Sequence, residues 1–566
     1  LYPLSSNPAL LSDEGYDLLL SFCRDFYYSN YTEPALLIRI IDILLPHYED
    51  RSDTESLLFL YICAGFSYME LSRTGEPTSR DKTIYFYTKV LSYRDQIEFF
   101  ESATSRDYIF IAYYNLIRVA PGLGILDIET AYRLWEELCQ IRTMPKFCQY
   151  DTTNPRIPQL CDRAINDFRA YGAVLNVERV IAPSAILSSL ENMTQIYYSE
   201  ILHERGSIYE CPVFTVFNYH YVQARNGTIT WEAAWQILDD YYVHKMQTIG
   251  QVSSPDLLAF YTNLPLNLID VLGHTHFKEE FKQATYRRYR NLITSYLMNQ
   301  PASLNSYTLN NGVQLVAFHP LILGTFQNRM EKMNFIVDLV VTRHLTTFTH
   351  SVMVSYLAEA IGKHILAARP ELLRIPSSYL EGNVYASPAE VLDYIVPAAL
   401  FHDIGKNGMI PIINTQHRKL NDYEFNIIQT HPQKGSDYLS SDPDFLIYQP
   451  VALGHHRSYD GTRGYPLSFD NTASPYRDAI DLIHICDCLD AATDYLSRNY
   501  HRAKPFDVVL NELKAGRGTE YNPDMVDVIL SDRELYNDLK MLTEQNRENI
   551  YYDIYLTFVN LRKKRQ

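Results

Sequence analysis

Long apolar runs and paired cysteines are both scarce in this sequence. The most apolar stretch, residues 35–45, is too short to span a bilayer and contains Arg39 and Asp42. The cysteines are spread thinly and show no paired spacing of the kind that binds zinc: Cys23, Cys63, Cys139, Cys148, Cys161, Cys211, Cys486 and Cys488. This usage is typical of a reducing compartment, so we expect a cytoplasmic protein. The sequence begins at Leu1 and not at a methionine, which leaves an upstream targeting or membrane segment open.

Positive charge is also in short supply. Lysine and arginine number 50 against 67 aspartates and glutamates, which gives a formal net charge of −17 at pH 7. A surface that holds duplex nucleic acid covers phosphates with Lys and Arg, so we expect no duplex DNA or RNA partner. An anionic substrate would instead need metal ions or a few well-placed basic side chains.

Helical patterning, in contrast, is abundant. The 566 residues are too many for one hydrophobic core, so two or more domains are expected. Over roughly the first three hundred residues, apolar and aromatic side chains recur at helical spacing between short Gly, Pro or Asn-Gly breaks. The clearest predicted helices cover residues 55–71, 81–97, 107–119 and 127–141. This half weakly resembles a tetratricopeptide-type helical array, and an irregular all-helical domain is an equal alternative.

The residue pattern changes at residues 301–325, where turn formers and proline replace the helical periodicity. We therefore expect a helical domain at residues 1–325, with a sensory, partner-binding or dimerising role. A second domain is expected at residues 326–566. Of the 17 histidines, 11 lie after residue 300, which places the chemistry in this second domain.

Five segments of the second domain carry histidine or aspartate at expected helix ends, in turns or on one helical face. A single such residue is more often a hydrogen-bonded core side chain than a ligand. Together, however, the segments supply the roughly six to eight imidazole and carboxylate ligands that a pair of divalent ions needs. The candidate ligands are His350, His402, Asp403, His431, His455, His456 and Asp487.

These ligands divide into two sets around a shared aspartate. We expect the first ion to be bound by His350, His402, Asp403 and Asp487, and the second by His431, His455 and His456 together with Asp403. Neighbouring residues on a helix point about 100° apart, so His402 can face one ion while Asp403 reaches between two. The set contains no cysteine, and imidazole with carboxylate suits Mn, Fe, Co or Ni.

The order of the motifs resembles the HD-GYP subgroup of the HD-domain phosphohydrolases. HDIGK at residues 402–406 is followed by HP, by HH with DGTRGYP, and by CDCLDAATD, and the resemblance runs from about residue 350 to residue 525. It implies an all-helical, metal-dependent phosphodiesterase of bacterial signalling that acts on cyclic di-GMP. The family's ligand positions fall on the same seven residues, and its motif lysine falls on Lys406, which would act with Asp403 in catalysis.

Departures from the family pattern bear on the metals and on the substrate. Thr346 stands where three-metal members of the family have a glutamate, so we predict two metal ions. We expect these ions to be Fe or Mn, with Co, Ni, Zn and Mg as alternatives. Arg457 replaces a glutamate, and Thr462-Arg463 lengthens the loop by one residue, which adds positive charge at an exposed lip of the pocket. The expected substrate contacts are Lys406, Arg457, Arg463, Tyr465, Asp490, Arg498 and Arg502.

The predicted reaction is hydrolysis of a cyclic dinucleotide, most directly cyclic di-GMP, to a linear dinucleotide or to mononucleotides. Another nucleotide substrate, such as a hybrid cyclic dinucleotide, is the first alternative. The second alternative is a non-catalytic nucleotide-binding or scaffold protein. The helical half would bind a protein partner or support a homodimer.

Overall fold

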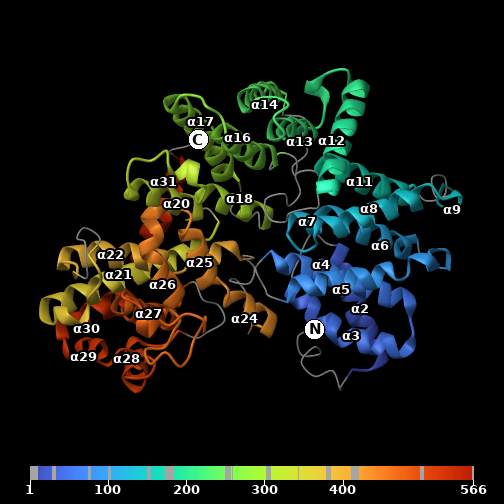
Figure 1. The fold of residues 1–566 in the computed structure, drawn as a ribbon. Coiled ribbons are helices and arrows are strands. Elements are labelled where there is room, and N and C mark those ends of the chain that lie inside the picture. Colours follow the sequence, from blue (N-terminus) through green and yellow to red (C-terminus); the bar gives the residue numbers. More distant parts are fainter. Residues whose placement is uncertain are drawn as a thin grey trace. The chain divides into compact units, whose positions relative to one another are not determined.

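Every regular element in the described part of the computed structural model is a helix (Figure 1). The structure describes residues 11–28, 34–73, 78–99, 103–148, 155–172, 184–248, 257, 259–300, 307–341, 343–377, 384–409, 420–496 and 503–563. Within these ranges, extended backbone pairs only in isolated bridges, such as that between Arg457 and Gly464. The all-α class predicted from the sequence is confirmed.

The chain forms two compact units. The first comprises Leu1–Phe260 and Asp270–Phe277, and the second comprises Tyr261–Ile269 and Lys278–Gln566. The division therefore falls earlier than the expected junction at residue 325. The reason is that α18 (Tyr307–Ala317), inside the expected first domain, packs on η8 (Ile404–Gly408) and α20 (Arg329–Val341) of the second unit.

Consecutive helices of the first unit pack on one another, from α2 to α6 and again from α11 to α14, and α11 also packs back on α6. All four of the clearest predicted helices are present, as α4, α5, α6 and α8. The longer helices are α2 (Asp13–Tyr28), α3 (Pro34–Arg51), α4 (Thr54–Ser72), α5 (Ser79–Leu91), α6 (Ala103–Tyr114), α8 (Ile128–Arg142), α11 (Arg156–Tyr171), α12 (Ser184–Arg205), α13 (Val213–Arg225) and α14 (Trp231–Met246). The short ones are η2 (Arg94–Phe99), η3 (Asn115–Val119), α7 (Ala120–Gly122), α9 (Pro145–Cys148) and η4 (Ile208–Glu210).

The regular elements described in the second unit are also helices. By residue number, η6 (Ala259–Asn263) and α16 (Leu264–Gly273) are each divided between the two units, and the second unit continues with α17 (Glu279–Asn299), α18, α19 (Pro320–Leu323) and α20. Then follow α21 (Leu345–Ala368), η7 (Pro370–Leu372), α22 (Pro388–Phe401), η8, α24 (Asp422–Ile428), α25 (His431–Leu439), η9 (Pro443–Tyr448) and α26 (Gln449–Gly454). The last elements are η10 (Asn471–Ala473), α27 (Arg477–Thr493), α28 (Phe506–Ala515), α29 (Pro523–Ser531), α30 (Arg533–Lys540), η11 (Met541–Gln545) and α31 (Arg547–Lys563).

Local sequence explains where the helices near the site begin. The side chain of Ser387 accepts a hydrogen bond from the backbone N–H of Glu390, whose carboxylate accepts one from the backbone N–H of Ser387, so a capping box starts α22. Asn421 and Glu424 form the same reciprocal arrangement at the start of α24. Each box satisfies two of the amide groups that a helix start leaves without partners.

The core of the second unit is built on α21, which packs against both α22 and α27. Several of its apolar side chains, among them Met353, Leu357 and Ile361, are fully buried. Burial of such side chains stabilises a fold by about 1.5–3 kcal/mol each, so these three helices form a rigid frame for residues at their ends. Among the described helices, none is both long enough and apolar enough to cross a membrane.

Candidate metal centre

The seven predicted ligands come from helices of this frame. His350 lies in α21, His402 and Asp403 directly follow α22, and His431 is the first residue of α25. The adjacent histidines 455 and 456 follow α26, and Asp487 lies within α27. All are buried except His456, whose side chain is 21% exposed. The structure therefore brings together in one place residues that the sequence separates by more than a hundred positions.

His350, His402 and Asp487 form a first cluster, whose candidate ligand atoms lie within 4.8 Å of one another. Nε2 of His350 is 3.0 Å from Oδ1 of Asp487. The centroids of the two imidazole rings are 5.3 Å apart, with the ring planes steeply tilted. Two imidazoles and a carboxylate at this spacing can ligate one divalent cation.

Asp403, His431, His455 and His456 form a second cluster under the same distance limit. Nε2 of His431 is 3.1 Å from Nε2 of His455 and 3.1 Å from Oδ1 of Asp403. The ring of His456 lies 4.2 Å from that of His455 and 5.0 Å from that of His431. Three imidazole rings and a carboxylate oxygen thus converge on one point.

Asp403 joins the two clusters through its two carboxylate oxygens. Its Oδ2 is 3.5 Å from Nε2 of both His350 and His402, in the first cluster. Its Oδ1 is 3.1 Å from Nε2 of His431 and 3.6 Å from Nε2 of His455, in the second. This is the arrangement of a carboxylate shared between two cation sites, which the sequence predicts for this residue.

Hydrogen bonds to the outer ring nitrogens set the tautomers of three of these histidines. In His402, His431 and His455, Nδ1 lies within hydrogen-bonding distance of a backbone carbonyl oxygen. Because a carbonyl oxygen only accepts, Nδ1 carries the hydrogen and Nε2 keeps its lone pair. The partners are the carbonyl groups of Ala399 at 2.6 Å, Ile428 at 2.6 Å and Ala452 at 3.0 Å.

Two inward-facing atoms of the site have no hydrogen-bond partner although they are buried: Nε2 of His402 and Oδ1 of Asp403. Buried polar atoms are ordinarily satisfied, and leaving one unsatisfied costs about 1–3 kcal/mol. Lone-pair nitrogens and carboxylate oxygens left in this way are the donor set of a divalent cation, so the residues fit the metals that the resemblance implies.

Burial and neighbouring charge shift the pKa values of the cluster. Burial lowers the pKa of His455 to about 4 and that of His456 well below its usual range, so both are neutral and able to ligate at pH 7. Burial alone would raise the pKa of Asp403, but the charges of Lys406 and His402 hold it well below its usual value. Burial would likewise lower the pKa of His350, yet its hydrogen bonds with Asp487 and Asp490 raise it to about 9.

Lys406 lies beside the shared aspartate. Its Nζ is 2.5 Å from Oδ2 of Asp403, and its side chain is 16% exposed. An ammonium group has three donors, so hydrogens remain for a second anionic oxygen at the edge of the clusters. This placement agrees with the phosphate contact expected for the motif lysine.

Arg457 differs from its expected place at an exposed lip, because it is only 5% exposed. Its guanidinium folds back into its own loop and donates hydrogen bonds to the carbonyl oxygens of Gly461 and Gly464. Gly464 has a φ of +88°, and a Cβ atom there would overlap the carbonyl oxygen of His456. The arginine therefore stabilises the tight turn of this loop, because its buried guanidinium donates hydrogen bonds to the loop's own carbonyl oxygens.

Tyr465 and Arg463 lie on the open side of the same loop. The ring of Tyr465 is half-buried, 4.6 Å from that of His456 and 6.1 Å from that of His431, which makes it a wall of the clusters. The side chain of Arg463 is 63% exposed and pairs with Glu520 at 3.2 Å. Arg498 and Arg502, expected to hold substrate, lie outside the described residues.

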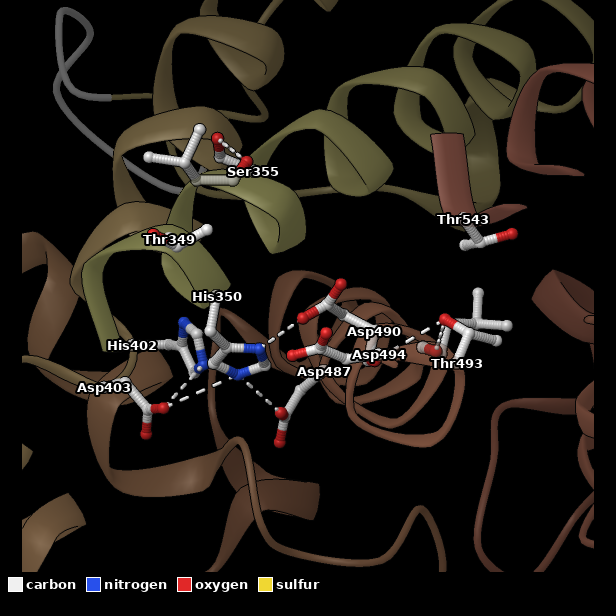
Figure 2. Close-up of polar contacts among 12 residues, drawn as sticks. Thr349, His350, Ser355, His402, Asp403, Asp487, Asp490, Thr493, Asp494 and Thr543 are labelled. Atoms are coloured by element: carbon white, nitrogen blue, oxygen red, sulfur yellow. Dashed lines mark hydrogen bonds and ion pairs between the residues drawn. The ribbon is translucent and has the colours of Figure 1, made fainter. Parts of the chain in front are cut away.

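Asp490, which we expect among the substrate contacts, lies behind the clusters. It is fully buried, and its Oδ2 accepts a hydrogen bond from Nδ1 of His350 at 2.6 Å (Figure 2). Figure 2 shows the imidazole of His350 between Asp490 on one side and Asp403 and Asp487 on the other. Asp490 thus contacts a candidate ligand directly and is shielded from the solvent side of the site.

Three residues that support the site have no role in the sequence prediction. Arg547 forms a 2.8 Å ion pair with Oδ1 of Asp490. Nε2 of His484 lies 3.3 Å from Oε1 of Glu520, and its Nδ1 donates a hydrogen bond to the carbonyl oxygen of His455 at 2.6 Å. His484 could have been found from its place in LIHICDCLD, whereas no local pattern marks Arg547 or Glu520.

Comparison with known proteins agrees with this site. The family profile of the HD domain matches residues 347–498, the range that contains all seven candidate ligands. The chain is 26% identical over 303 residues to a "Cyclic di-GMP phosphodiesterase" of Vibrio cholerae, covering 48% of this chain and 60% of that protein. It is 33% identical over 146 residues to the "Cyclic di-GMP phosphodiesterase response regulator RpfG" of Xanthomonas campestris pv. campestris, covering 25% and 37%.

A relative with a different substrate in its name is also similar. The "3'3'-cGAMP-specific phosphodiesterase 2" of Vibrio cholerae is 25% identical over 203 residues, which cover 35% of this chain and 37% of that protein. The chain thus spans less than two thirds of the length of each of these three relatives. Residues 347–498 are an HD domain, and the predicted similarity of this part of the chain to the HD-GYP cyclic dinucleotide phosphodiesterases is confirmed.

Proposed function

We propose that the second unit is a two-metal phosphodiesterase that hydrolyses a cyclic dinucleotide. Cyclic di-GMP is the first candidate substrate. The observation that carries this proposal is the position of the Asp403 carboxylate, whose two oxygens face two separate ligand clusters. Fe and Mn are the ions we favour, since the donors are imidazole nitrogens and carboxylate oxygens without a thiolate. Bound there, two divalent ions supply an activated water and offset phosphate charge.

The side chains around the clusters have distinct proposed roles. Lys406 donates to a non-bridging phosphate oxygen with the hydrogens that Asp403 does not use. Tyr465 stacks on or orients a base, because its half-buried ring lies against His456 at the open edge. Arg463 reaches a second phosphate by leaving Glu520, an exchange that its 63% exposure makes inexpensive.

The products follow from the number of bonds cut. Hydrolysis of one phosphodiester opens the ring to a linear dinucleotide, and a second cut gives mononucleotides. The similarity to a relative named as specific for 3′3′-cGAMP supports a hybrid cyclic dinucleotide as the second candidate substrate. The two candidates differ in one base, so the contacts that separate them lie at the rim and not in the clusters.

The test is a substrate panel on metal-loaded protein. The purified chain, loaded anaerobically with Fe(II) or Mn(II), is incubated with cyclic di-GMP, 3′3′-cGAMP and linear diguanylate, and products are separated by chromatography. Faster turnover of cyclic di-GMP than of 3′3′-cGAMP supports the first substrate, and the reverse order supports the second. A protein that holds both ions and cleaves neither nucleotide contradicts the proposed activity.

For the first unit we propose binding of a protein partner or contribution to a homodimer. Packing of consecutive helices is typical of arrays whose long surfaces bind proteins, which supports this role. We place the protein in the cytoplasm, and the free thiols among its described cysteines support that proposal. Light scattering on the full chain distinguishes a dimer from a monomer.

A further inference from the structure

Arg547 is a fully buried arginine behind the metal centre, at the first residue of α31. It lies beyond residues 347–498, the range that matches the HD domain. Its Nη1 binds Oδ1 of Asp490 at 2.8 Å, its Nη2 donates to Oγ1 of Thr493 at 2.8 Å, and its Nε donates to a backbone carbonyl oxygen of η11 at 2.9 Å. Each part of the guanidinium group therefore has a defined partner.

Burying this charge is costly unless it is compensated. Removing a guanidinium from water carries a penalty of several kcal/mol, which only close pairing with good geometry repays. Asp490 supplies the pairing charge and is itself 0% exposed. Its carboxylate is divided between two partners: Oδ1 faces Arg547, and Oδ2 faces Nδ1 of His350 at 2.6 Å.

His350 depends on this carboxylate in a way that the other inner histidines do not. His402, His431 and His455 are oriented by carbonyl oxygens three or four residues earlier in the chain, within their own helical turns. The Nδ1 of His350 is instead held by Asp490, which comes from another helix, 140 residues away. The orientation of His350, and with it the direction in which its Nε2 faces the first cluster, are thus set by tertiary contacts.

We propose that Arg547 is a positioning residue of the metal centre, acting through Asp490 on His350. The guanidinium fixes the carboxylate with Oδ2 towards His350, and the carboxylate accepts the Nδ1 hydrogen, so that Nε2 faces His402 and Asp487. This inference rests on the proposed metal centre. It extends the functional site to the C-terminal helix and assigns Asp490 to ligand orientation instead of substrate contact.

Metal binding tests the inference without any nucleotide. The full chain is stripped of metal and titrated with Co(II), whose visible absorption reports ligand geometry, and bound ions per chain are counted by mass spectrometry. Arg547→Met is expected to weaken binding at the first cluster about 10- to 100-fold and to alter that part of the spectrum, as loss of a partner behind a histidine ligand does. Arg547→Lys restores one contact with Asp490 and should recover part of the loss.

A matched control separates positioning from general packing. Ile554 lies on the same helix, in a buried cluster with Met353 of α21, and its apolar side chain takes no part in the hydrogen bonds that join Arg547, Asp490 and His350. Ile554→Ala should lower the unfolding temperature while leaving Co(II) affinity and spectrum unchanged. Equal losses of metal in Ile554→Ala and Arg547→Met would overturn the inference, since they would indicate a packing role for α31.

A double-variant cycle covers the case in which Arg547→Met folds poorly. Asp490→Asn combined with Arg547→Met removes the buried charge pair as a unit, so no unpaired charge remains in the core. If Arg547 acts through Asp490, the double variant binds Co(II) no more weakly than Asp490→Asn alone. Additive losses of Co(II) affinity in the double variant would contradict an action of Arg547 through Asp490.

The two failures are distinguishable. A wild-type chain that binds no Co(II) contradicts the proposed metal centre and the inference with it. A wild-type chain that binds two ions, together with Arg547→Met of unchanged affinity and spectrum, contradicts the inference alone.

Discussion

Asp403 presents each of its carboxylate oxygens to a different group of histidines, so its replacement affects both cation sites at once. Asp403→Asn keeps the shape but removes the negative charge and one ligating oxygen. We expect bound metal to fall from about two ions per chain to about one or fewer, and hydrolysis to fall more than about 100-fold. Metal content and turnover are measured on the same preparation.

The control for this variant is Asp393→Asn, an exposed aspartate on α22. It should keep both ions and full turnover. An Asp403→Asn protein that retains both ions would contradict a shared carboxylate, even if its turnover fell.

Lys406 gives a prediction of the opposite kind, in which metal content and activity separate. Its ammonium contacts Asp403 but belongs to neither ligand cluster. Lys406→Met should keep both ions and lower kcat/KM about 10- to 100-fold, the equivalent of one hydrogen bond to a charged group. Steady-state kinetics with metal analysis measures this, and Lys363→Met, an exposed lysine of α21, is the control. Unchanged kcat/KM would remove Lys406 from the proposed site.

Sequence reasoning at this scale succeeds where chemistry is local. All seven predicted ligands lie in the two clusters, because imidazole and carboxylate groups are recognisable by residue type. It fails where a partner is distant. Arg547 meets Asp490 across 57 residues, and the sequence offers no signal for that contact. The sequence predicts an exposed Arg457, whereas its guanidinium is buried, because the backbone carbonyl groups that accept its hydrogen bonds come within reach only once the loop has turned.

At the scale of elements, amphipathic periodicity and capping residues predict the helices well. The helix expected at residues 55–71 is α4, Thr54–Ser72, and Asn421 with Glu424 forms a capping box at the start of α24. Gly405 is the exception. A glycine that follows an apolar helical run is typical of a helix C-cap, but α22 ends at Phe401, and Gly405 lies in η8 against the backbone of α25. Such an approach is a tertiary requirement that no local pattern contains.

This approach makes Gly405 a sensitive position. A Cβ atom there would overlap the carbonyl oxygen of His431 and come within 2.5 Å of the amide nitrogen of Gly435. Gly405→Ala must therefore move η8 and α25 apart, displacing Asp403 or His431. We expect the free energy of unfolding to fall by about 1–3 kcal/mol and metal at the second cluster to be lost. Urea unfolding and metal analysis measure the two effects.

Gly312→Ala in α18 is the matched control. Its added methyl group would meet the side chain of Thr262 at an ordinary 3.7 Å. This variant should be as stable as the wild type or more stable by about 0.5–1 kcal/mol, since alanine favours a helix. Gly405→Ala with unchanged stability and metal content would show that the two backbones can separate at no cost.

At the scale of the whole chain, the sequence locates the chemistry better than it locates the boundary. Histidines concentrate after residue 300, and both clusters lie in the second unit. The expected boundary at residue 325 rested on local turn formers, whereas the compact units are defined by packing. Helix α17 joins the second unit because it packs with α18, α19 and α20. Helix α18 joins it because it packs with α20 and η8. Turn residues mark a break in the chain, and only packing decides which side a helix joins.

The first unit should be sensitive to acid through His220, which is independent of the metal centre. His220 is 8% exposed in α13, its ring lies against Tyr198 and Tyr219, and its Nε2 has no hydrogen-bond partner. Burial lowers its pKa to about 4 from the usual 6.5. The unfolded chain therefore takes up a proton below pH 6.5 while the folded unit does not. Stability from this group is complete above pH 6.5 and is lost as the pH falls towards 4.

The loss amounts to about 3 kcal/mol across that interval, at about 1.4 kcal/mol per unit of pKa difference. His220→Gln removes the titration, so the first unit of this variant should lose about 3 kcal/mol less than the wild type between pH 7 and pH 4. Urea unfolding of the full chain at several pH values, followed by tyrosine fluorescence, measures the difference. His244→Gln replaces an exposed histidine of α14 and should retain the wild-type slope. Equal slopes in His220→Gln and the wild type would mean that the buried imidazole accepts its proton without opening the helix packing around it.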